Sequence, residues 1–307
     1  MSDYSAETPV CLFIYNRPEH TSRVVDTIAN ASPPLMLVIA DGPASDADKD
    51  LCERTRAEIT DRDFDFEVRT NFASFNLGLP ERFTTGLNWV FEQVTEAIIL
   101  EDDIVPTQSF FQYCDILLDH FREDERVMEI TGRNQLGRWK RSEYDYHFSH
   151  YGGIWGWATW RDAWKEYDQR MELWDQDIVR DRIRDVLADD SQYRYVERVY
   201  DKTKQGEISS WGYRWGFARN RNHGLSAVPA KNLIKNIGFG EGATNTTNTA
   251  HKFANKETYE MSFPLTHPPF VAPDREYDRR FHELRQTRSK PRRILDALLD
   301  TAGIKKL

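Results

Sequence analysis

The sequence has few cysteines and no long apolar run. Cys11, Cys52 and Cys114 are far apart and form no Cys-x-x-Cys pair, which argues against a disulfide framework or a cysteine-ligated metal. No stretch approaches the roughly 18 apolar residues that a membrane-spanning helix needs, and the opening residues MSDYSAETPV lack a basic and then apolar leader. These absences predict a cytoplasmic protein.

Excess positive charge and glycine-rich phosphate loops are also missing. The net charge of -9 argues against nucleic acid as a partner. Neither a GxxxxGK[ST] loop nor a GxGxxG turn occurs, so no glycine-rich cradle for a phosphate is evident. A bound phosphate would therefore be held by side chains and a metal ion.

The sequence does contain an alternation of strand-like and helix-like segments up to residue 131. Short apolar runs typical of buried strands occupy residues 10–15, 35–40, 66–70, 97–100 and 127–131, and amphipathic stretches typical of helices occupy residues 21–29, 79–94 and 109–121. This order predicts an α/β, Rossmann-like fold in which helices flank a mostly parallel sheet. Ligands of such sheets bind at the carboxyl ends of the strands.

One predicted strand runs directly into three carboxylates. In AIILEDDIVP, residues 97–106, the apolar run is followed by Glu101, Asp102 and Asp103. Adjacent carboxylates at a half-buried strand end repel one another strongly, so the arrangement suggests a cation that neutralises them. The acidic run EDE at 123–125 shows that such triplets also occur by chance, and there we expect a solvated loop.

Two other predicted strands also end in polar residues. Arg17 follows the first strand, and Asp41 with Gly42 follows the second. A guanidinium suits a diphosphate, a lone carboxylate suits a ribose or base donor, and paired carboxylates suit a divalent ion. Taken singly, Asp41-Gly42 fits a plain turn and Arg17 fits a surface position. Their joint placement favours a nucleotide site.

Several segments together resemble a known family. CLFIYNRPEHT, LVIADGP, FNLGLPERFTTGLNWVFE, AIILEDDIVP and GGIWGWATWRDAW look like bacterial and archaeal glycosyltransferases of the GT-A nucleotide-diphospho-sugar fold. They are similar, more distantly, to the N-acetylglucosaminyltransferase that starts complex N-glycan branches. The resemblance covers most of residues 9 to about 250 and implies a hexosyl- or N-acetylhexosaminyltransferase that acts on polysaccharide, lipopolysaccharide or glycoprotein-glycan precursors.

The resemblance also implies roles for individual residues. The last acid of the run, Asp103, is expected to bind Mn²⁺ or Mg²⁺. The other residues are expected to contact the nucleotide, its ribose or the diphosphate of the donor; they are Arg17, Asp41, Arg82, Glu101 and Asp102.

The region from 132 to 250 is rich in aromatic residues. Trp157, Trp160 and Trp164 have the spacing of one helical stripe and are expected to be core residues. Gly153, Trp155 and Gly156 precede this stripe, and glycines there would allow backbone to approach a bound sugar, while indole can stack on one. We therefore predict acceptor or sugar binding for these three. His147 and His150 have metal-ligand spacing without a third ligand, so we assign them no site.

An inverting transfer also needs a general base for the acceptor hydroxyl. The related transferase carries an Asp between tryptophans near this part of the chain, whereas the segment GEISSWGYRW has Ser209, Ser210 and Gly212 where an acid is expected. This departure leaves Glu207 as the nearest candidate for the base, with Glu241 in GFGEGA as the alternative. Both fit solvated loop positions equally well.

The last 23 residues, 285–307, carry seven Lys or Arg against two Asp and a short apolar face. A basic amphipathic end can lie on an anionic membrane, where lipid-linked acceptors are found, so we predict peripheral association at the inner face of the membrane. A frayed tail or a helix docked on its own domain fits as well.

These observations predict a GT-A fold with a nucleotide-sugar-binding half at 1–131, an acceptor-binding half at 132–250 and an extension at 251–307. The predicted function is metal-dependent transfer of a sugar from a nucleoside diphosphate donor to a glycan or lipid-linked acceptor. Two alternatives stay open. One is a sugar-nucleotide nucleotidyltransferase, which would need a glycine-rich loop after the first strand, and the other is a non-catalytic carbohydrate-binding protein.

Overall fold

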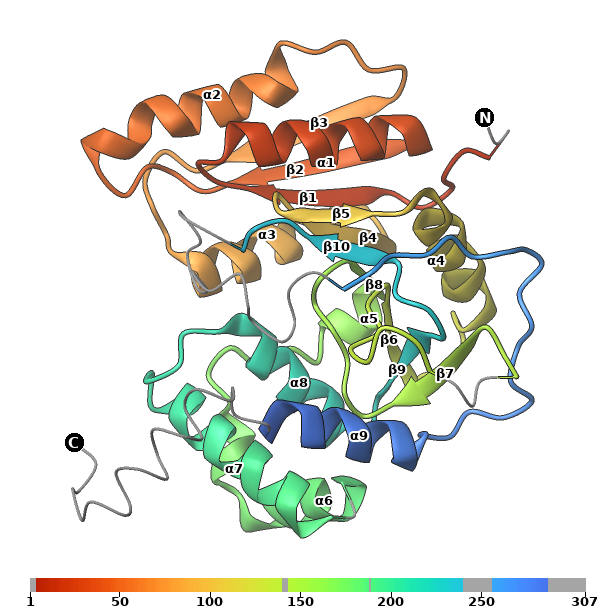
Figure 1. Ribbon diagram of the computed structural model, residues 1–307. Helices are drawn as coiled ribbons and strands as arrows, with labels where there is room; N and C mark the ends of the chain where they lie inside the picture. The colour runs from red at the N-terminus through yellow and green to blue at the C-terminus, as the bar shows by residue number, and fades with distance from the viewer. Residues whose placement is uncertain (1–3, 140–142, 188, 240–255, 287–307) are drawn as a thin grey trace, which may run out of the picture.

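The computed structural model describes residues 4–139, 143–187, 189–239 and 256–286. It has an α/β fold in which helices flank a large mixed sheet, as Figure 1 shows. The sheet has eight strands in the order β3-β2-β1-β4-β8-β6-β9-β7, and β5 and β10 form a separate antiparallel pair. The α/β, Rossmann-like prediction agrees with this architecture.

The first part of the sheet follows the predicted order closely. Its four parallel strands are β1 (Val10–Ile14), β2 (Leu35–Ala40), β3 (Glu67–Phe72) and β4 (Glu96–Glu101). The helices between and after them are α1 (Pro18–Ala31), α2 (Lys49–Thr60), α3 (Leu79–Gln93) and α4 (Gln108–His120). Of these, only α2, preceded by the short helix η1 (Asp46–Asp48), was not predicted. Most of its residues are polar, and only Cys52, Thr55 and Ile59 are buried.

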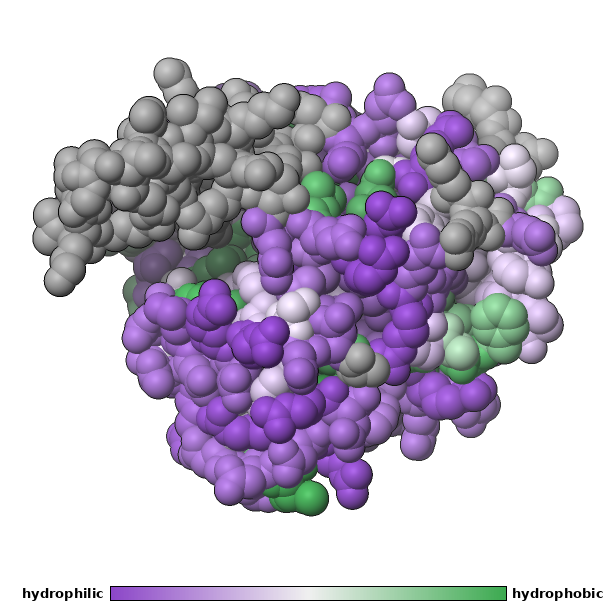
Figure 2. Space-filling view, turned by 60° about the horizontal axis from the view of Figure 1, so that its bottom comes forward, coloured by the Kyte–Doolittle hydropathy of each residue, from purple (hydrophilic) through white to green (hydrophobic). Residues whose placement is uncertain are grey.

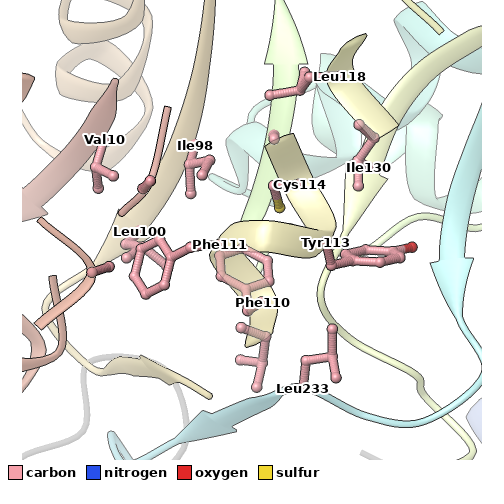
Figure 3. Close-up of a cluster of buried hydrophobic side chains, with 14 of the residues drawn as sticks. Val10, Ile98, Leu100, Phe110, Phe111, Tyr113, Cys114, Leu118, Ile130 and Leu233 are labelled. Carbon is pink, nitrogen blue, oxygen red and sulfur yellow. The ribbon is translucent and has the colours of Figure 1, made fainter. Parts of the chain in front are cut away.

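Alternate residues of the strands build two cores on opposite faces of the sheet. Val10, Leu12 and Ile14 face the core formed with α1 and α4, whereas Cys11 and Phe13 face the core formed with α3 and α8. Figure 3 shows the first of these cores, where aromatic side chains of α4 pack against strand residues. Burial on both faces explains why β1, β2 and β4 are continuous apolar runs. The prediction of a buried strand at residues 66–70 is wrong in its burial, because β3 lies at the edge of the sheet and its residues are exposed or half-buried.

The second part of the sheet comes from later in the chain. Its strands are β6 (Val127–Thr131), β7 (Tyr146–Ser149), β8 (Trp157–Trp160) and β9 (Leu225–Pro229). Strand β8 lies antiparallel between β4 and β6, so one sheet contains strands from both predicted halves. The paired strands β5 (Ile104–Pro106) and β10 (Ile234–Asn236) lie beside it in Figure 1.

The prediction that Trp157, Trp160 and Trp164 lie on one helix is wrong. Trp157 and Trp160 lie on β8, and the short helix α5 (Arg161–Trp164) begins only after them. Pairing with β4 and β6 decides the conformation of this segment, and periodicity cannot detect such pairing. The prediction that all three are core residues is confirmed, because each side chain is buried.

Helices later in the chain form a third apolar cluster, seen at the bottom of Figure 1. They are η2 (Glu172–Asp175), α6 (Asp177–Leu187), α7 (Asp190–Lys204), α8 (Trp211–Arg221) and α9 (Arg275–Gln286). Hydrophilic side chains predominate on the face drawn in Figure 2. No helix in the described ranges is both long and apolar enough to cross a membrane.

Candidate functional site

The chain reverses its direction of strand addition between β1 and β4. It proceeds outward from β1 through β2 to β3, and α3 then returns it to β4 on the other side of β1. Crossover helices that leave neighbouring strands toward opposite faces open a crevice at the carboxyl ends of those strands. The predicted site residues after β1 and β4 lie at this reversal point.

A cavity of 350 Å³ lies at this point, and we call it the strand-end cavity. The predicted donor-site residues from three strand ends and from α3 all line it: Arg17, Asp41, Arg82, Glu101, Asp102 and Asp103. Trp155 and Gly238 complete the wall on the side of the second half of the sheet. The structure therefore brings together residues that are up to 221 positions apart (238 minus 17).

The guanidinium of Arg17 lies between two of the three acids. Its Nη1 atom is 3.3 Å from Asp102 Oδ1 and 3.1 Å from Asp103 Oδ2. Arg17 thus supplies part of the positive charge that the acidic run requires. Both contacts are largely shielded, since each of these side chains is less than 20% exposed.

The acids nevertheless retain raised pKa values. Burial raises the pKa of Asp102 to about 7, with repulsion from Asp103 as the next cause. Burial and repulsion from both aspartates also raise the pKa of Glu101 well above its usual range, and burial raises that of Asp103. One guanidinium therefore does not offset the burial and crowding of three carboxylates, and a further cation would be stabilised here.

The donor set fits a magnesium or manganese ion that also contacts a phosphate. No group of three or more His, Cys, Asp or Glu side chains converges within the part of the chain that the structure describes. Magnesium is commonly held by only one or two carboxylates together with substrate phosphates and water. Asp102 and Asp103 could supply that share, and the backbone of Gly238 borders the site, because a Cβ there would lie 2.0 Å from Asp103 Oδ2.

Asp41 organises the loop that leads into α3. Its carboxylate accepts hydrogen bonds from the backbone N–H groups of Gly42, Leu77 and Gly78, at 2.8 to 3.0 Å, and from the side chain of Asn76. Gly78 needs its glycine, because its φ of +78° is disfavoured for other residues. Asp41 lines the cavity, yet its local role is to fix this loop; its contact with a nucleotide stays a prediction.

Arg82 is buried and bonded to protein oxygens. Its Nε donates to the carbonyl of Ala40 at 3.2 Å, and its Nη2 donates to the side-chain oxygen of Asn71 at 2.9 Å and to the carbonyl of the same residue. Burial lowers the pKa of Arg82. These bonds hold the ends of β2 and β3 together, and contact with a diphosphate stays a prediction for this residue.

A second, larger cavity of 640 Å³ adjoins the first, and we call it the α8 cavity. Both cavities are lined by Leu79, Glu101 and Trp155, so they meet there. The wall of the α8 cavity comes from residues 150–155, α7, α8 and α9, which Figure 1 shows in the lower half of the molecule. It is rich in aromatic residues: Tyr151, Tyr195, Tyr200, Tyr213, Trp211, Trp215 and Phe281.

Trp155 is half-buried where the two cavities meet. The guanidinium of Arg133 lies over its ring, with Cζ 3.7 Å from the ring centroid, and Phe239 contacts it edge-on at 5.6 Å. Burial lowers the pKa of Arg133 to about 9. The indole is therefore held in a fixed orientation by neighbours on two sides, as a stacking platform requires.

The glycines near Trp155 allow close packing of protein on protein. A Cβ at Gly152 would lie 2.0 Å from Glu129 Oε1, and one at Gly156 would lie 2.4 Å from Ile234. Gly156 also has a φ of +67°. Gly153 lines the α8 cavity, whereas Gly156 lines neither cavity. Packing thus accounts for Gly152 and Gly156, and sugar binding stays a prediction for Gly153 and Gly156.

Glu129 is a buried acid that the sequence analysis did not single out. Its carboxylate accepts hydrogen bonds from Gly153 N at 2.9 Å, Ser226 Oγ at 2.9 Å and Trp215 Nε1 at 2.6 Å. It also pairs with Arg219 at 3.4 Å. Glu129 therefore ties α8 and the segment before β8 to β6. The signal for it was an acid in the middle of the apolar strand VMEIT.

One of the two candidates for the general base, Glu207, lies within the described residues. Glu207 lines the α8 cavity, with its side chain 52% exposed and its carboxylate 2.6 Å from Lys202 Nζ. Ser209, Ser210 and Gly212 line the same cavity at the start of α8. Glu241 lies outside the described residues, as do residues 287–307 of the predicted membrane-binding tail.

His147 and His150 are buried, and burial keeps them neutral. It lowers the pKa of His147 to about 4 and that of His150 to about 3. His147 packs on the ring of Tyr277 at 4.3 Å and fits a packing role, whereas His150 lines the α8 cavity.

Comparison with known proteins gives no family for this chain. No family model and no curated protein matches it. The function is therefore inferred from the site itself.

Proposed function

We propose that this protein is a metal-dependent glycosyltransferase of the GT-A fold. It would move a sugar from a nucleoside diphosphate donor to a glycan or lipid-linked acceptor. The observation that carries the proposal is the meeting of two unlike cavities at Glu101, Leu79 and Trp155. One cavity presents acids and an arginine at strand ends, and the other presents aromatic rings. A transferase needs such a pair of adjoining sites so that the reacting atoms are held close together.

The strand-end cavity would bind the donor. Arg17 and a divalent ion held by Asp102 and Asp103 would face the diphosphate, and Arg17 would have to share or release its contacts with the two aspartates. The bound metal would act as a Lewis acid that stabilises the departing nucleoside diphosphate. Phe13 and Phe83, stacked with centroids 3.9 Å apart, would form an apolar part of the wall.

The α8 cavity would bind the acceptor. Tyrosine and tryptophan rings suit the apolar faces of sugars, and their polar atoms can bond to hydroxyl groups. Glu207 would accept the proton of the acceptor hydroxyl as that hydroxyl attacks the donor sugar. Its side chain is 52% exposed, and its carboxylate lies 2.6 Å from Lys202 Nζ.

Nucleotide binding with and without metal tests the donor site. We expect a nucleoside diphosphate, chosen from UDP, GDP, CDP and dTDP by thermal shift, to bind in the presence of Mn²⁺ and to raise the melting temperature by mass action. Asp103→Asn should abolish the Mn²⁺-dependent part of this binding in calorimetry while the variant still folds. Glu125→Gln, which removes an exposed acid from the second acidic run, is the matched control.

Unchanged affinity in Asp103→Asn would remove the acidic run from the site. A protein that binds a nucleotide sugar and a glycan but neither transfers nor hydrolyses the sugar would be a carbohydrate-binding protein instead. The neutral residues Ser209, Ser210 and Gly212 at the start of α8 favour that second candidate.

A further inference from the structure

The face of α8 that lines the α8 cavity carries two glycines. Gly212 and Gly216 are four residues apart and Asn220 follows after another four, so the three lie on one face of the helix, and all three line the cavity. A glycine inside a helix costs about 0.5–1 kcal/mol relative to alanine. Glycine at these positions therefore needs a reason in the surrounding structure.

Packing explains Gly212 but not Gly216. A Cβ at Gly212 would lie 2.7 Å from Ile154 Cδ1, which is too close for a normal contact. A Cβ at Gly216 would lie 3.5 Å from the hydroxyl oxygen of Tyr200, an ordinary van der Waals distance, and would meet no closer atom of the described residues outside its own helix. The absence of a side chain at Gly216 therefore leaves space open in the cavity.

The α8 cavity extends away from the strand-end cavity along this face of the helix. Its near end lies at the start of α8, because Trp211 stacks on Phe83 with ring centroids 4.3 Å apart and Phe83 lines the strand-end cavity. From Gly212 to Asn220 the helix rises about 12 Å, at about 1.5 Å per residue. Residues at both ends of this stretch line the cavity, so the cavity is longer than one sugar ring.

Two buried polar groups at the far end of the cavity lack partners. His150 Nδ1 and Asn220 Oδ1 have no hydrogen bond or ion pair with the described residues, and the two residues are only 6% and 4% exposed. Arg219 Nη1 donates to the carbonyl of His150 at 3.4 Å, so His150 lies beside the end of α8 that carries Asn220. A buried polar group without a partner is destabilising, so these two groups point to a ligand.

A hydroxyl group matches both of these side chains. The neutral imidazole of His150 has one donor and one acceptor nitrogen, and the amide of Asn220, whose Nδ2 donates to Tyr200 at 2.8 Å, also contains both kinds of atom. The last torsions of His and Asn side chains are broad, so a small rotation can turn each group toward a bound molecule. Since a hydroxyl also donates and accepts, a ligand rich in hydroxyl groups satisfies both.

We propose that His150 and Asn220 form a distal subsite of the α8 cavity, which binds hydroxyl groups of a neutral sugar beyond the one that reacts. The acceptor is then an oligosaccharide that lies along Gly212 and Gly216, with its reacting end where the two cavities meet. Because the subsite is remote from that junction, it contributes to acceptor affinity and not to the chemical step. This inference rests on the proposed function, since it assigns the α8 cavity to the acceptor.

Glycan binding by the full-length protein tests the proposal. An array of neutral glycans, with monosaccharides and longer glycans of the same backbones, is screened without metal or nucleotide, and the series that binds best is measured by calorimetry. We expect affinity to rise about tenfold or more from the monosaccharide to the di- or trisaccharide. A monosaccharide that binds as tightly as the longer glycans of its series, or no binding to any glycan, would overturn the proposal.

Variants of the two polar residues test the subsite itself. Asn220→Leu and His150→Phe should each weaken binding of the longer glycan about tenfold and leave the affinity for the monosaccharide almost unchanged. Asn222→Leu is the matched control, because Asn222 is exposed and does not line the cavity. Wild-type affinity for the longer glycan in both cavity variants would overturn the proposal, since the two groups would then bind only water.

A variant of Gly216 tests the path along α8. Leucine forms helices better than glycine does, so Gly216→Leu should fold, as thermal melting checks, while its side chain occupies the open space and blocks the longer glycan. Full affinity of this variant for the longer glycan would show that the ligand does not lie along α8 and would also overturn the proposal. Metal-dependent nucleotide binding is measured in the same variants and should not change, so a failure at the donor site is distinguishable from a failure here.

Discussion

At the scale of single residues, Arg17 is notable because it is the counter-ion of two buried acids. It follows β1 and lies within 3.3 Å of two acids that follow β4. The acids would be more strongly repelled without it, because their pKa values are raised even in its presence. Arg17 therefore acts as a built-in counter-ion that a metal and a diphosphate could supplement.

Replacing Arg17 should lower the stability of the fold and make that stability more dependent on a divalent cation. We expect Arg17→Gln to lower the free energy of unfolding by about 1–3 kcal/mol, since it removes charge-assisted hydrogen bonds from poorly solvated carboxylates. Added Mn²⁺ should then raise the melting temperature of the variant more than that of the wild type. Arg54→Gln, which breaks an exposed pair with Glu19, is the control and should show neither effect. An Arg17→Gln variant as stable as the wild type, with no greater response to Mn²⁺, would contradict this account.

Glu207 is the residue on which the proposed chemistry can be tested most directly. We expect Glu207→Gln to lower the turnover number for transfer by about 10² to 10⁴, the usual effect of removing a general base, with little change in donor KM. Glu197→Gln, on the neighbouring helix α7 and outside the α8 cavity, should keep full turnover. Turnover is measured by release of the nucleoside diphosphate in the presence of an acceptor. If Glu207→Gln and Glu241→Gln are both as active as the wild type, neither glutamate is the base, and a retaining mechanism without a dedicated base becomes the better explanation.

At the scale of elements, one buried carboxylate joins three segments around the α8 cavity. Glu129 of β6 binds Trp215 and Arg219 of α8, Gly153 before β8, and Ser226 of β9. Every bond is made in the interior, since Glu129 is 0% exposed. The position of the cavity wall relative to the sheet therefore depends on this residue.

Removing the Glu129 carboxylate should be strongly destabilising. We expect Glu129→Ala to lower the free energy of unfolding by about 3–5 kcal/mol, because it removes the carboxylate that pairs with the buried charge of Arg219. Urea unfolding measures this change. Glu125→Ala, in the exposed turn just before β6, should stay within about 0.5 kcal/mol of the wild type. A loss of less than 1 kcal/mol in Glu129→Ala would show that the bonds of the Glu129 carboxylate are not important for stability.

At the scale of the whole molecule, a single sheet supports both cavities. Strand β8 pairs with β4, whose carboxyl end carries the acids, and with β6, which carries Glu129. The strand-end cavity and the α8 cavity are thus held at a fixed separation by strands that hydrogen-bond to one another. Such rigidity suits a reaction that depends on the relative placement of two substrates.

The basic end of the chain gives a prediction at this same scale. A chain ended at residue 286 loses six Lys or Arg of the sequence at 287–307 and should no longer bind vesicles that contain anionic lipid, at about 1 kcal/mol per basic residue near the surface. The shortened chain should keep metal-dependent nucleotide binding, because every described residue of the strand-end cavity precedes the cut. Flotation with anionic and with zwitterionic vesicles measures the difference. Equal binding of both chains to anionic vesicles would exclude the tail as the membrane contact.

The first part of the fold and the positions of its strand ends follow from the order of residues alone. Runs such as LMLVIA are apolar throughout because both faces of the sheet are covered, and that pattern is local. Since parallel strands end at one edge, the sequence also indicated that Arg17, Asp41 and the acids at 101–103 would lie near one another, as they do in the strand-end cavity.

The other features of the fold and of the site depend on contacts between residues that are distant in sequence. The strand conformation of Trp157–Trp160 depends on pairing with β4 and β6, which are distant in sequence, and so the helical spacing was misleading. The partners of Glu129 and the bonds of Arg82 to the ends of β2 and β3 are likewise long-range contacts. The junction of the two cavities joins residues from α3, β4 and the segment before β8. Local periodicity records which face of an element is buried, whereas the identity of the residues that meet across elements depends on how the chain packs.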